Sequence, residues 1–276
     1  MNYKSYNDLI KDTNKLITQL KDEYELVVSI PRSGNIPASI IALHFNIPYM
    51  SIDEWKNGVP NCKYSQRQDN NKTGKVLVID DSYNSGQRIT QAKESLKNWT
   101  TKELHFAVIY APNQNPQLDF YAECVPQPRV FEWNLFNHDI IKRSLIDIDG
   151  VVCEDPVISE ASHPTQYAEW VTKAKLKKVI KINIGGFVTN RLEQHRDATE
   201  QWLTDNGFKF NSLVMAKYKT PSERIAAQRY GKDKAEVYSN SNAVLFIESA
   251  VSQAEEIFKL TGRPVYCVDN NTMYKR

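Results

Sequence analysis

The chain has 276 residues, of which 41% are hydrophobic and 25% charged, and its 35 basic and 33 acidic residues leave a net charge of +2 at pH 7. This length accommodates two domains of ordinary size, each with its own hydrophobic core. The near balance of charge argues against nucleic acid or a membrane surface as a partner, because both attract a concentrated basic surface. No apolar run is long enough to cross a bilayer, and the N-terminus lacks the apolar core of a signal peptide.

The cysteines carry no sign of a disulfide framework or a metal site. The four residues are Cys62, Cys124, Cys153 and Cys267, and their spacing matches neither pattern. Scattered cysteines of this kind indicate reduced thiols, so the sequence predicts a cytoplasmic protein. The oligomeric state does not follow from the sequence, and a homo-oligomer stays open.

The first part of the chain predicts a helix, a buried strand and a second helix. Apolar residues recur at helical spacing over residues 5–22, and residues 25–30 form a short apolar run typical of a buried strand. The loop Pro31-Arg32-Ser33-Gly34-Asn35 then leads into a helix over residues 37–45. Such a loop places unpaired N–H groups at a helix N-terminus, where they bind anions. A simple strand-to-helix turn is the alternative for this loop taken alone.

The stretch from Lys75 to Thr90 repeats this arrangement and adds two carboxylates. An apolar run over residues 76–79 predicts a strand buried on both faces, and Asp80 and Asp81 follow it directly. A loop of small and polar residues comes next, and a helix begins after it. The loop is a second candidate anion site. The acidic pair suits the hydroxyl groups of a sugar attached to that anion, or a magnesium ion between the two carboxylates.

Together the two loops resemble the substrate-binding loops of type I phosphoribosyltransferases, which use phosphoribosyl diphosphate (PRPP). The resemblance implies that Asp80 and Asp81 hold the ribose hydroxyl groups. It assigns the 5′-phosphate to Ser82, Tyr83, Asn84, Ser85, Gly86 and Gln87, and the pyrophosphate to Arg32, Ser33 and Gly34. The sequence departs from the family pattern at Tyr83, Asn84 and Gln87, where smaller residues, apolar residues or Thr are usual.

A long polar segment between Asp53 and Gly74 lacks any periodicity. A loop of this length in a compact domain is typical of disorder or of a functional lid. The resemblance implies a lid that closes over the diphosphate, and Lys63 and Arg67 are its candidate pyrophosphate-binding cations. Solvated loop charges are the equal alternative for these two residues.

The nucleobase site is the least determined part of the first half. Residues 103–110 predict another strand, and a proline-containing irregular region follows it up to residues 129–133. Phe131 or Trp133 could stack on a base. Packing against a second domain is the alternative, and the sequence does not name the base.

A new strand is predicted over residues 143–148, ending in Asp147-Ile148-Asp149-Gly150. Carboxylates two residues apart on a strand point to the same side, and the glycine lets the chain turn immediately afterwards. The pattern resembles the first motif of the haloacid dehalogenase (HAD) phosphatases. This resemblance implies that Asp147 attacks phosphorus, and that Asp149 protonates the leaving oxygen and then activates water.

Three later positions extend the HAD resemblance. A strand-like run over residues 179–188 ends at Thr189, whose hydroxyl would bind the phosphoryl group, with Asn190 and Arg191 near it. Lys234 would neutralise the nucleophile and phosphate, with Lys219 as the alternate. A strand over residues 243–247 ends in Glu248-Ser249, where two acids are usual. The resemblance implies a magnesium ion held by Asp147, Asp149 through its carbonyl, and Glu248.

The remaining elements of the second half are two helices, over residues 193–206 and 250–260, and a last strand over residues 264–268. Between Cys153 and Lys178 there is room only for a small insertion, so no large cap domain is expected.

The two resemblances predict an α/β protein with two Rossmann-like domains, each a mostly parallel sheet flanked by helices. Residues 1–140 would form the phosphoribosyltransferase-like domain and residues 141–276 the HAD-like domain. The implied function is transfer of a phosphoribosyl group from PRPP to a nucleobase, with hydrolysis of a phosphomonoester such as the nucleotide product. Two alternatives stay open: a PRPP- or nucleotide-binding regulator without turnover, and an adaptor that brings substrate to the phosphatase.

Overall fold

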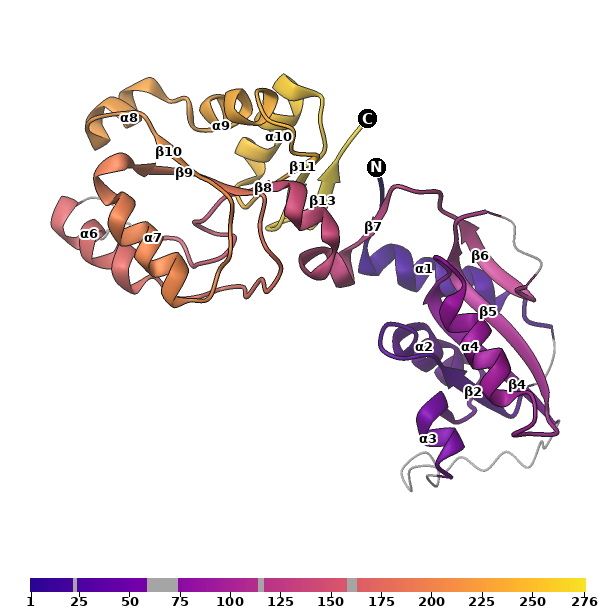
Figure 1. The fold of residues 1–276 in the computed structure, drawn as a ribbon. Coiled ribbons are helices and arrows are strands. Elements are labelled where there is room, and N and C mark those ends of the chain that lie inside the picture. The colour runs from indigo at the N-terminus through magenta and orange to yellow at the C-terminus, as the bar shows by residue number, and fades with distance from the viewer. Residues whose placement is uncertain (22–23, 59–73, 114–116, 158–162) are drawn as a thin grey trace. The chain divides into compact units, whose positions relative to one another are not determined.

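The computed structural model describes residues 1–21, 24–58, 74–113, 117–157 and 163–276. The chain divides into two compact units, which we call the N-terminal unit (residues 2–133) and the C-terminal unit (residues 134–276). Figure 1 shows that each unit has a sheet flanked by helices. The predicted α/β class is therefore confirmed for both halves of the chain.

The N-terminal unit is built on a five-stranded parallel sheet. Its strands follow the order β3 (Tyr49–Ser51), β2 (Leu26–Ser29), β4 (Lys75–Ser82), β5 (Glu103–Ala111) and β6 (Phe120–Cys124). A separate parallel pair joins β1 (Asn2–Lys4) to β7 (Arg129–Phe131). The acidic pair lies near the carboxyl end of β4, which is the central strand of the larger sheet.

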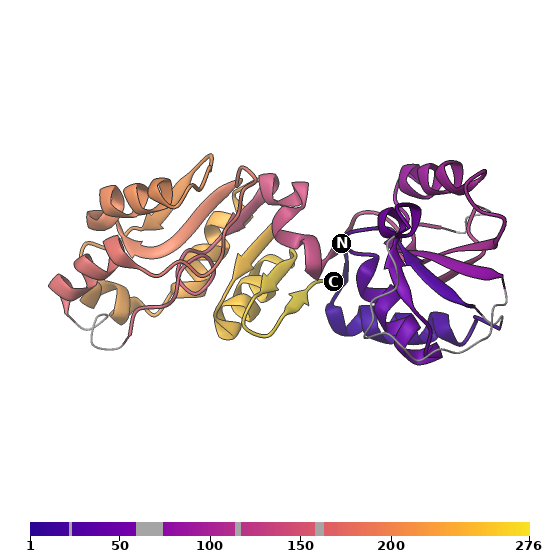
Figure 2. The same cartoon turned by 90° about the horizontal axis from the view of Figure 1, so that it is seen from below.

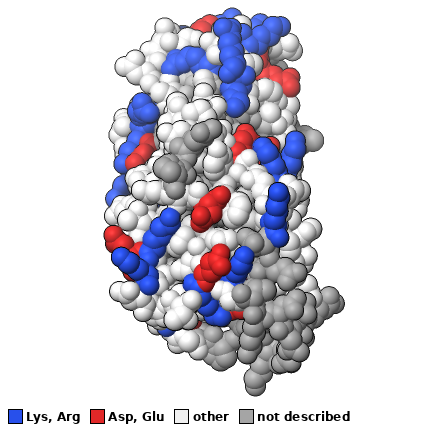
Figure 3. All heavy atoms as spheres, turned by 90° about the vertical axis from the view of Figure 1, so that its right-hand side faces the viewer, with Lys and Arg blue, Asp and Glu red and all other residues white. Residues whose placement is uncertain are grey.

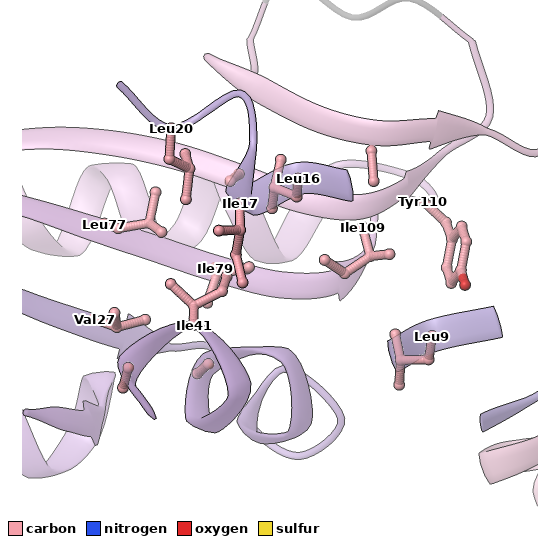
Figure 4. Close-up of a cluster of buried hydrophobic side chains, with 14 of the residues drawn as sticks. Leu9, Leu16, Ile17, Leu20, Val27, Ile41, Leu77, Ile79, Ile109 and Tyr110 are labelled. Atoms are coloured by element: carbon pink, nitrogen blue, oxygen red, sulfur yellow. The ribbon is translucent and has the colours of Figure 1, made fainter. Parts of the chain in front are cut away.

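Helices cover both faces of this sheet, so the central strand is apolar on both sides. The helices are α1 (Tyr6–Ile17), α2 (Asn35–Phe45), α3 (Ile52–Lys56) and α4 (Gln87–Leu96). Leu77 and Ile79 of β4 pack with α1 and α2 in one cluster (Figure 4), while Val76 and Val78 pack with α4 in the other. Because successive strand residues point to opposite faces, this double burial explains the unbroken apolar run.

The C-terminal unit has a six-stranded mixed sheet. The order is β10 (Leu213–Ala216), β9 (Gly186–Leu192), β8 (Ser144–Ile146), β11 (Leu245–Glu248), β12 (Val265–Cys267) and β13 (Thr272–Tyr274), seen from two directions in Figures 1 and 2. All neighbouring pairs are parallel except β12 and β13. The carboxyl ends of β9, β8 and β11 therefore meet at one edge of the sheet, where α/β proteins commonly bind ligands.

Five α-helices and three short 3₁₀ helices complete the described elements. They are α6 (Pro164–Lys173), α7 (Arg196–Asp205), α8 (Pro221–Ala227), α9 (Tyr230–Ser239), α10 (Val251–Thr261), η2 (Glu132–Asn137), η3 (Asp139–Arg143) and η4 (Glu193–His195). In Figure 1, α6 and α7 lie on one side of the sheet of the C-terminal unit, and α8, α9 and α10 lie on the other.

Several predicted element boundaries were wrong. The strand predicted over residues 179–188 begins only at Gly186 and continues through Thr189 to Leu192. The apolar run that suggested an earlier start includes Val179, which is exposed. The strand predicted from Arg143 begins at Ser144, after a 3₁₀ helix. The four edge strands of the two larger sheets, β3, β6, β10 and β13, were not predicted. Of these, β6 lies inside the proline-containing region, and β13 follows the strand that was predicted to be the last.

The polar segment after Asp53 begins with the end of α3. Lys63 and Arg67, the two predicted lid cations, lie outside the described residues. Within the described ranges, no helix combines the length and apolar character needed to span a membrane. On the face drawn in Figure 3, basic and acidic side chains are interspersed.

Gly34 should be indispensable to the N-terminal unit. A Cβ at this position would lie 2.4 Å from the Ile30 carbonyl oxygen and 2.9 Å from that of Ile79, so the backbone would have to move. We expect Gly34→Ala to lower the free energy of unfolding by about 2 kcal/mol, the usual size of an overpacking penalty. Urea unfolding measures this, with Ser39→Ala in the same helix as the matched control. Equal midpoints for the two variants would contradict the close approach.

Candidate functional site

The first candidate site is the acidic pair of β4. Asp80 and Asp81 are only 1% and 5% exposed, and the Asp81 amide donates to Asp80 Oδ1 at 2.8 Å. Burial, together with the neighbouring Asp81 carboxylate, raises the pKa of Asp80 to about 8. Two buried carboxylates this close disfavour double ionisation, so Asp80 is largely protonated at pH 7.

The Arg-Ser-Gly loop lies directly against this pair. The Ser33 hydroxyl donates to Asp81 Oδ1 at 2.8 Å, and the backbone of Gly34 packs on that of Asp80. Arg88, from the first turn of α4, donates to the Pro31 carbonyl at 3.2 Å. The structure therefore brings together the loop predicted for pyrophosphate and the acidic pair predicted for the ribose hydroxyls. The side chain of Arg32 is exposed.

The loop from Ser82 to Gln87 connects β4 to α4. The amides of Asn84, Ser85 and Gly86 have no hydrogen-bond partner among the described residues, so they are free to bind an anion. Gly86 adopts a φ of +80°, and a Cβ there would lie 2.1 Å from the Tyr83 hydroxyl oxygen. Both features restrict this position to glycine.

Two residues that depart from the family pattern make contacts outside the loop. The Tyr83 hydroxyl donates to Gln117 Oε1 at 3.3 Å, and Asn84 Oδ1 accepts from Gln127 Nε2 at 2.9 Å. Buried Arg129 donates to the carbonyls of Tyr83 and Val125 and so fixes the start of the loop. Burial lowers the pKa of Arg129, and Asp81 works against that change. No local pattern in the sequence pointed to this role of Arg129.

The two aromatic residues proposed for the base behave differently. Phe131 is 5% exposed and belongs to the core of the N-terminal unit, stacked on Trp133 with ring centroids 4.8 Å apart. Trp133 is half-buried, and its indole N–H donates to Asp81 Oδ2 at 2.7 Å. With Ser33 on the other oxygen, both oxygens of Asp81 already accept hydrogen bonds from this unit. Each carboxylate oxygen can accept a second hydrogen bond, so a ligand hydroxyl either shares Asp81 with Ser33 and Trp133 or displaces one of them.

The second candidate site centres on Lys234 in α9. Its Nζ lies 2.6 Å from Asp147 Oδ2 and 2.7 Å from Glu248 Oε2, and all three side chains are buried. Burial and the nearby Glu248 raise the pKa of Asp147 well above its ordinary value, and Lys234 opposes this shift. Burial alone would lower the pKa of Lys234, but Asp147 and Glu248 raise it. The alternate, Lys219, lies before α8 outside this cluster.

Asp149 is held by a residue that the sequence analysis placed only nearby. The fully buried Arg191 donates from Nη2 to Asp149 Oδ1 at 2.6 Å and from Nε at 3.0 Å, which fixes the direction of the carboxylate. Thr189 is 3% exposed, and its hydroxyl accepts from the Arg191 amide at 3.2 Å. The Ser249 hydroxyl donates to the Asp149 carbonyl at 3.1 Å.

A pocket of ≈ 260 Å³ opens over this cluster. It is lined by Asp147, Asp149, Asp155, Pro156, Tyr167, Asn190, Arg224, Tyr230, Ser249, Ala250, Gln253 and Asp269. Of the residues predicted for the site, the two aspartates of the first motif line the pocket, and so does Asn190, which was expected near the phosphoryl group. Thr189, Lys234 and Glu248 are buried and do not line the pocket.

The predicted magnesium ligands are not grouped as a metal site. Among the described residues, no three His, Cys, Asp or Glu side chains are placed to hold a metal ion. The physical reason lies in Lys234, whose ammonium group stands between Asp147 and Glu248. In this arrangement the three predicted ligands do not fit a magnesium ion, and the magnesium requirement stays a prediction.

Sequence reasoning missed Asp155, Arg224 and Asp269 at the pocket. Asp269 comes two residues after the end of β12, so the rule that parallel strands end at one edge could have found it. Asp155 and Arg224 lie in a loop and on a short helix, and no spacing in the sequence pointed to them.

The geometry of the N-terminal unit defines a parallel α/β domain that presents an acidic pair and a glycine-containing loop at one edge of its sheet. Residues 2–140 match the family model described as the phosphoribosyl transferase domain. The chain belongs to this family.

Individual relatives match the same half of the chain. The xanthine-guanine phosphoribosyltransferase of Desulfotalea psychrophila is 31% identical over 143 residues, which cover 49% of this chain and 84% of that protein. The enzyme of the same name from Nitratidesulfovibrio vulgaris is 28% identical, over 49% of this chain and 82% of that protein.

Solved structures that match include the Helicobacter pylori xanthine-guanine-hypoxanthine phosphoribosyltransferase, with a TM-score of 0.38 and 20% identity over 50% of this chain and 99% of that chain. The purine phosphoribosyltransferase of Pyrococcus horikoshii matches with a TM-score of 0.35 and 18% identity, over 48% of this chain and 92% of that chain.

Replacing Trp133 should show whether its indole competes with ligand for Asp81. We expect Trp133→Phe to bind PRPP about threefold to tenfold more tightly, because the ring is kept while the N–H on Asp81 Oδ2 is lost. Isothermal titration with PRPP measures this, with Trp99→Phe as the control. Weaker binding by Trp133→Phe would instead mean that the indole contacts the ligand directly.

Proposed function

We propose that the N-terminal unit transfers the phosphoribosyl group of PRPP to a purine base of the guanine or xanthine type and releases pyrophosphate. The observation that carries this is the meeting of two loops at one acidic pair, through the bond between Ser33 and Asp81. The 31% identity to a xanthine-guanine phosphoribosyltransferase supports the choice of base. In this proposal, Asp80 and Asp81 bind the ribose hydroxyls and residues 82–87 bind the 5′-phosphate.

For the C-terminal unit we propose an HAD-like phosphatase that acts on a phosphomonoester. Support comes from three adjacent strands: Asp147 follows β8, Glu248 ends β11 and Thr189 lies within β9. Lys234 bridges Asp147 and Glu248. Asp147 and Asp149 also line a single pocket that a substrate can enter. Because Ser249 stands where a second acid is usual, this unit departs from the pattern at the predicted magnesium site.

The proposed hydrolysis has two steps. A carboxylate oxygen of Asp147 bonds to phosphorus as the bond from phosphorus to the leaving oxygen breaks, and Asp149 gives its proton to that oxygen. Asp149 then takes a proton from water, which attacks phosphorus and releases inorganic phosphate and the free Asp147. Lys234 offsets the negative charge of Asp147 throughout.

The simplest relation between the two proposed activities is that the C-terminal unit hydrolyses the product of the N-terminal unit. The nucleotide made by the transferase is itself a phosphomonoester, so its hydrolysis would yield a nucleoside. Removal of the nucleotide would draw the reversible transfer forward.

A regulator without turnover is the second candidate for the N-terminal unit. This candidate is favoured by the hydrogen bonds that Asp81 already accepts from the protein itself, one on each oxygen, from Ser33 and Trp133. Such a protein would bind PRPP or nucleotide and release no pyrophosphate with any base.

Pyrophosphate release tests the transferase. The full chain with PRPP, magnesium and guanine, xanthine or hypoxanthine in turn is expected to release pyrophosphate with at least one base. Asp81→Asn should slow this reaction about a hundredfold, because a charged acceptor for the ribose hydroxyl is lost. Lys102→Gln, a surface change, is the control. Tight PRPP binding without pyrophosphate release would favour the regulator.

The product formed by Asp147→Asn tests the coupling. The unaltered chain should convert PRPP and base to nucleoside, whereas Asp147→Asn should accumulate nucleotide, because an amide cannot attack phosphorus. Chromatography separates the two products, and parallel reactions with and without magnesium in the phosphatase step report whether the cation is needed. Identical products from the two proteins would disprove the coupling.

A further inference from the structure

The pocket of the C-terminal unit carries an unbalanced set of charges. Its lining includes the four carboxylates Asp147, Asp149, Asp155 and Asp269, and Arg224 is the single cationic residue among the lining residues that the structure describes. A phosphomonoester is largely dianionic near pH 7. Such a substrate meets repulsion from the carboxylates unless positive charge is available to receive it.

The other cations near the pocket are already paired with carboxylates. Lys234 lies between Asp147 and Glu248, and Arg191 is bound to Asp149. Lys177 donates to the Gly150 carbonyl at 2.6 Å and lies 3.8 Å from Asp269. These groups offset charge that the protein itself supplies, so they add little attraction for an incoming dianion.

Arg224 differs from these cations in its surroundings. The side chain starts from α8, and its Nη1 donates to the Asn190 carbonyl at 2.6 Å. Its guanidinium carbon lies 5.9 Å from the centre of the Tyr230 ring. Its Nε is buried and has no hydrogen-bond partner in the described part of the chain. A buried donor without a partner is costly, and it is commonly explained by a ligand that completes the bond.

The residue that holds Arg224 is a neighbour of Thr189, which is proposed to bind the phosphoryl group. Asn190, whose carbonyl holds Nη1, follows Thr189 on β9, and its side chain donates to Gln253 Oε1 at 3.2 Å. Burial raises the pKa of the Tyr167 hydroxyl, and Arg224 works against that rise. The guanidinium of Arg224 therefore lies close to Tyr167, which lines the same pocket. Arg224 is therefore held at the edge of the pocket by Asn190 and Tyr167, and among the described residues its Nε still lacks a hydrogen-bond partner.

We propose that Arg224 binds the phosphoryl oxygens of a dianionic phosphomonoester in this pocket and thereby selects phosphorylated substrates. The proposal rests on the phosphatase function proposed for the C-terminal unit. A guanidinium suits this role because its planar fork gives two parallel hydrogen bonds to an oxyanion. The Asn190 carbonyl fixes one end of the fork, so little side-chain freedom is lost when the phosphoryl group binds.

The test compares Arg224→Gln and Arg224→Lys with the unaltered full chain. Binding of inorganic phosphate is measured by isothermal titration, and hydrolysis of p-nitrophenyl phosphate is followed in parallel. Arg224→Gln is expected to bind phosphate roughly tenfold to a hundredfold more weakly, the range for loss of a charged hydrogen bond. Its KM should rise by a similar factor with a smaller change in kcat. The phosphate affinity of Arg224→Lys should lie between those of Arg224→Gln and the unaltered chain, because lysine keeps the positive charge but cannot form two parallel hydrogen bonds.

Arg196→Gln is the matched control, because Arg196 pairs with Glu193 and Glu200 outside the pocket. It should bind phosphate as the unaltered chain does, and thermal unfolding verifies that every variant is folded. Equal phosphate binding by Arg224→Gln and the unaltered chain, or no binding by the unaltered chain, would overturn the proposal. Phosphate binding that depends on Arg224 without hydrolysis of any phosphomonoester would uphold the binding role and refute the phosphatase.

Discussion

Carboxylates buried at the ends of parallel strands are the constraint on which both units depend. A carboxylate removed from water is strongly destabilising unless a hydrogen-bond donor or a cation satisfies it. In the N-terminal unit, Asp81 is satisfied by neutral donors from Ser33 and Trp133. In the C-terminal unit, Asp147 is satisfied by the ammonium of Lys234. Whether the hydrogen-bond partner is neutral or cationic determines the kind of group that each carboxylate can bind or attack.

Neutral partners suit a site that binds neutral hydroxyl groups. A ribose hydroxyl can replace a serine hydroxyl or an indole N–H at Asp81 with no change in charge, so the exchange costs little desolvation. The raised pKa of Asp80 has the same consequence, because it favours the neutral form of that carboxyl group. A cationic partner suits a nucleophile instead. In the proposed phosphatase reaction, Lys234 would keep Asp147 close to a positive charge when a phosphoryl group approaches.

The sequence predicted the buried strands and the residues at their ends because both follow from local pattern. The apolar run of β4 and the strand before Asp147 could be recognised from hydrophobicity alone. Short edge strands such as β6 and β13 escaped, since half-exposed strands of three to five residues carry little pattern. The partners of the carboxylates were harder to predict. Trp133 reaches Asp81 from 52 positions away, and the ion pair between Arg191 and Asp149 spans 42. Contacts over such separations depend on tertiary packing, which no local spacing encodes.

The two proposed reactions are joined by one recognition element, the 5′-phosphate. Pyrophosphate can attack a nucleotide and reverse the transfer only while the nucleotide is held by its phosphate, which the free amides of Asn84, Ser85 and Gly86 would bind. In the proposed coupling, hydrolysis in the C-terminal unit would remove that phosphate. The nucleoside that remains no longer presents the anion that the loop recognises, so its return to the first site is disfavoured by the loss of several charge-assisted hydrogen bonds. A phosphatase in the same chain would thus make the transfer directional without any change in the transferase itself.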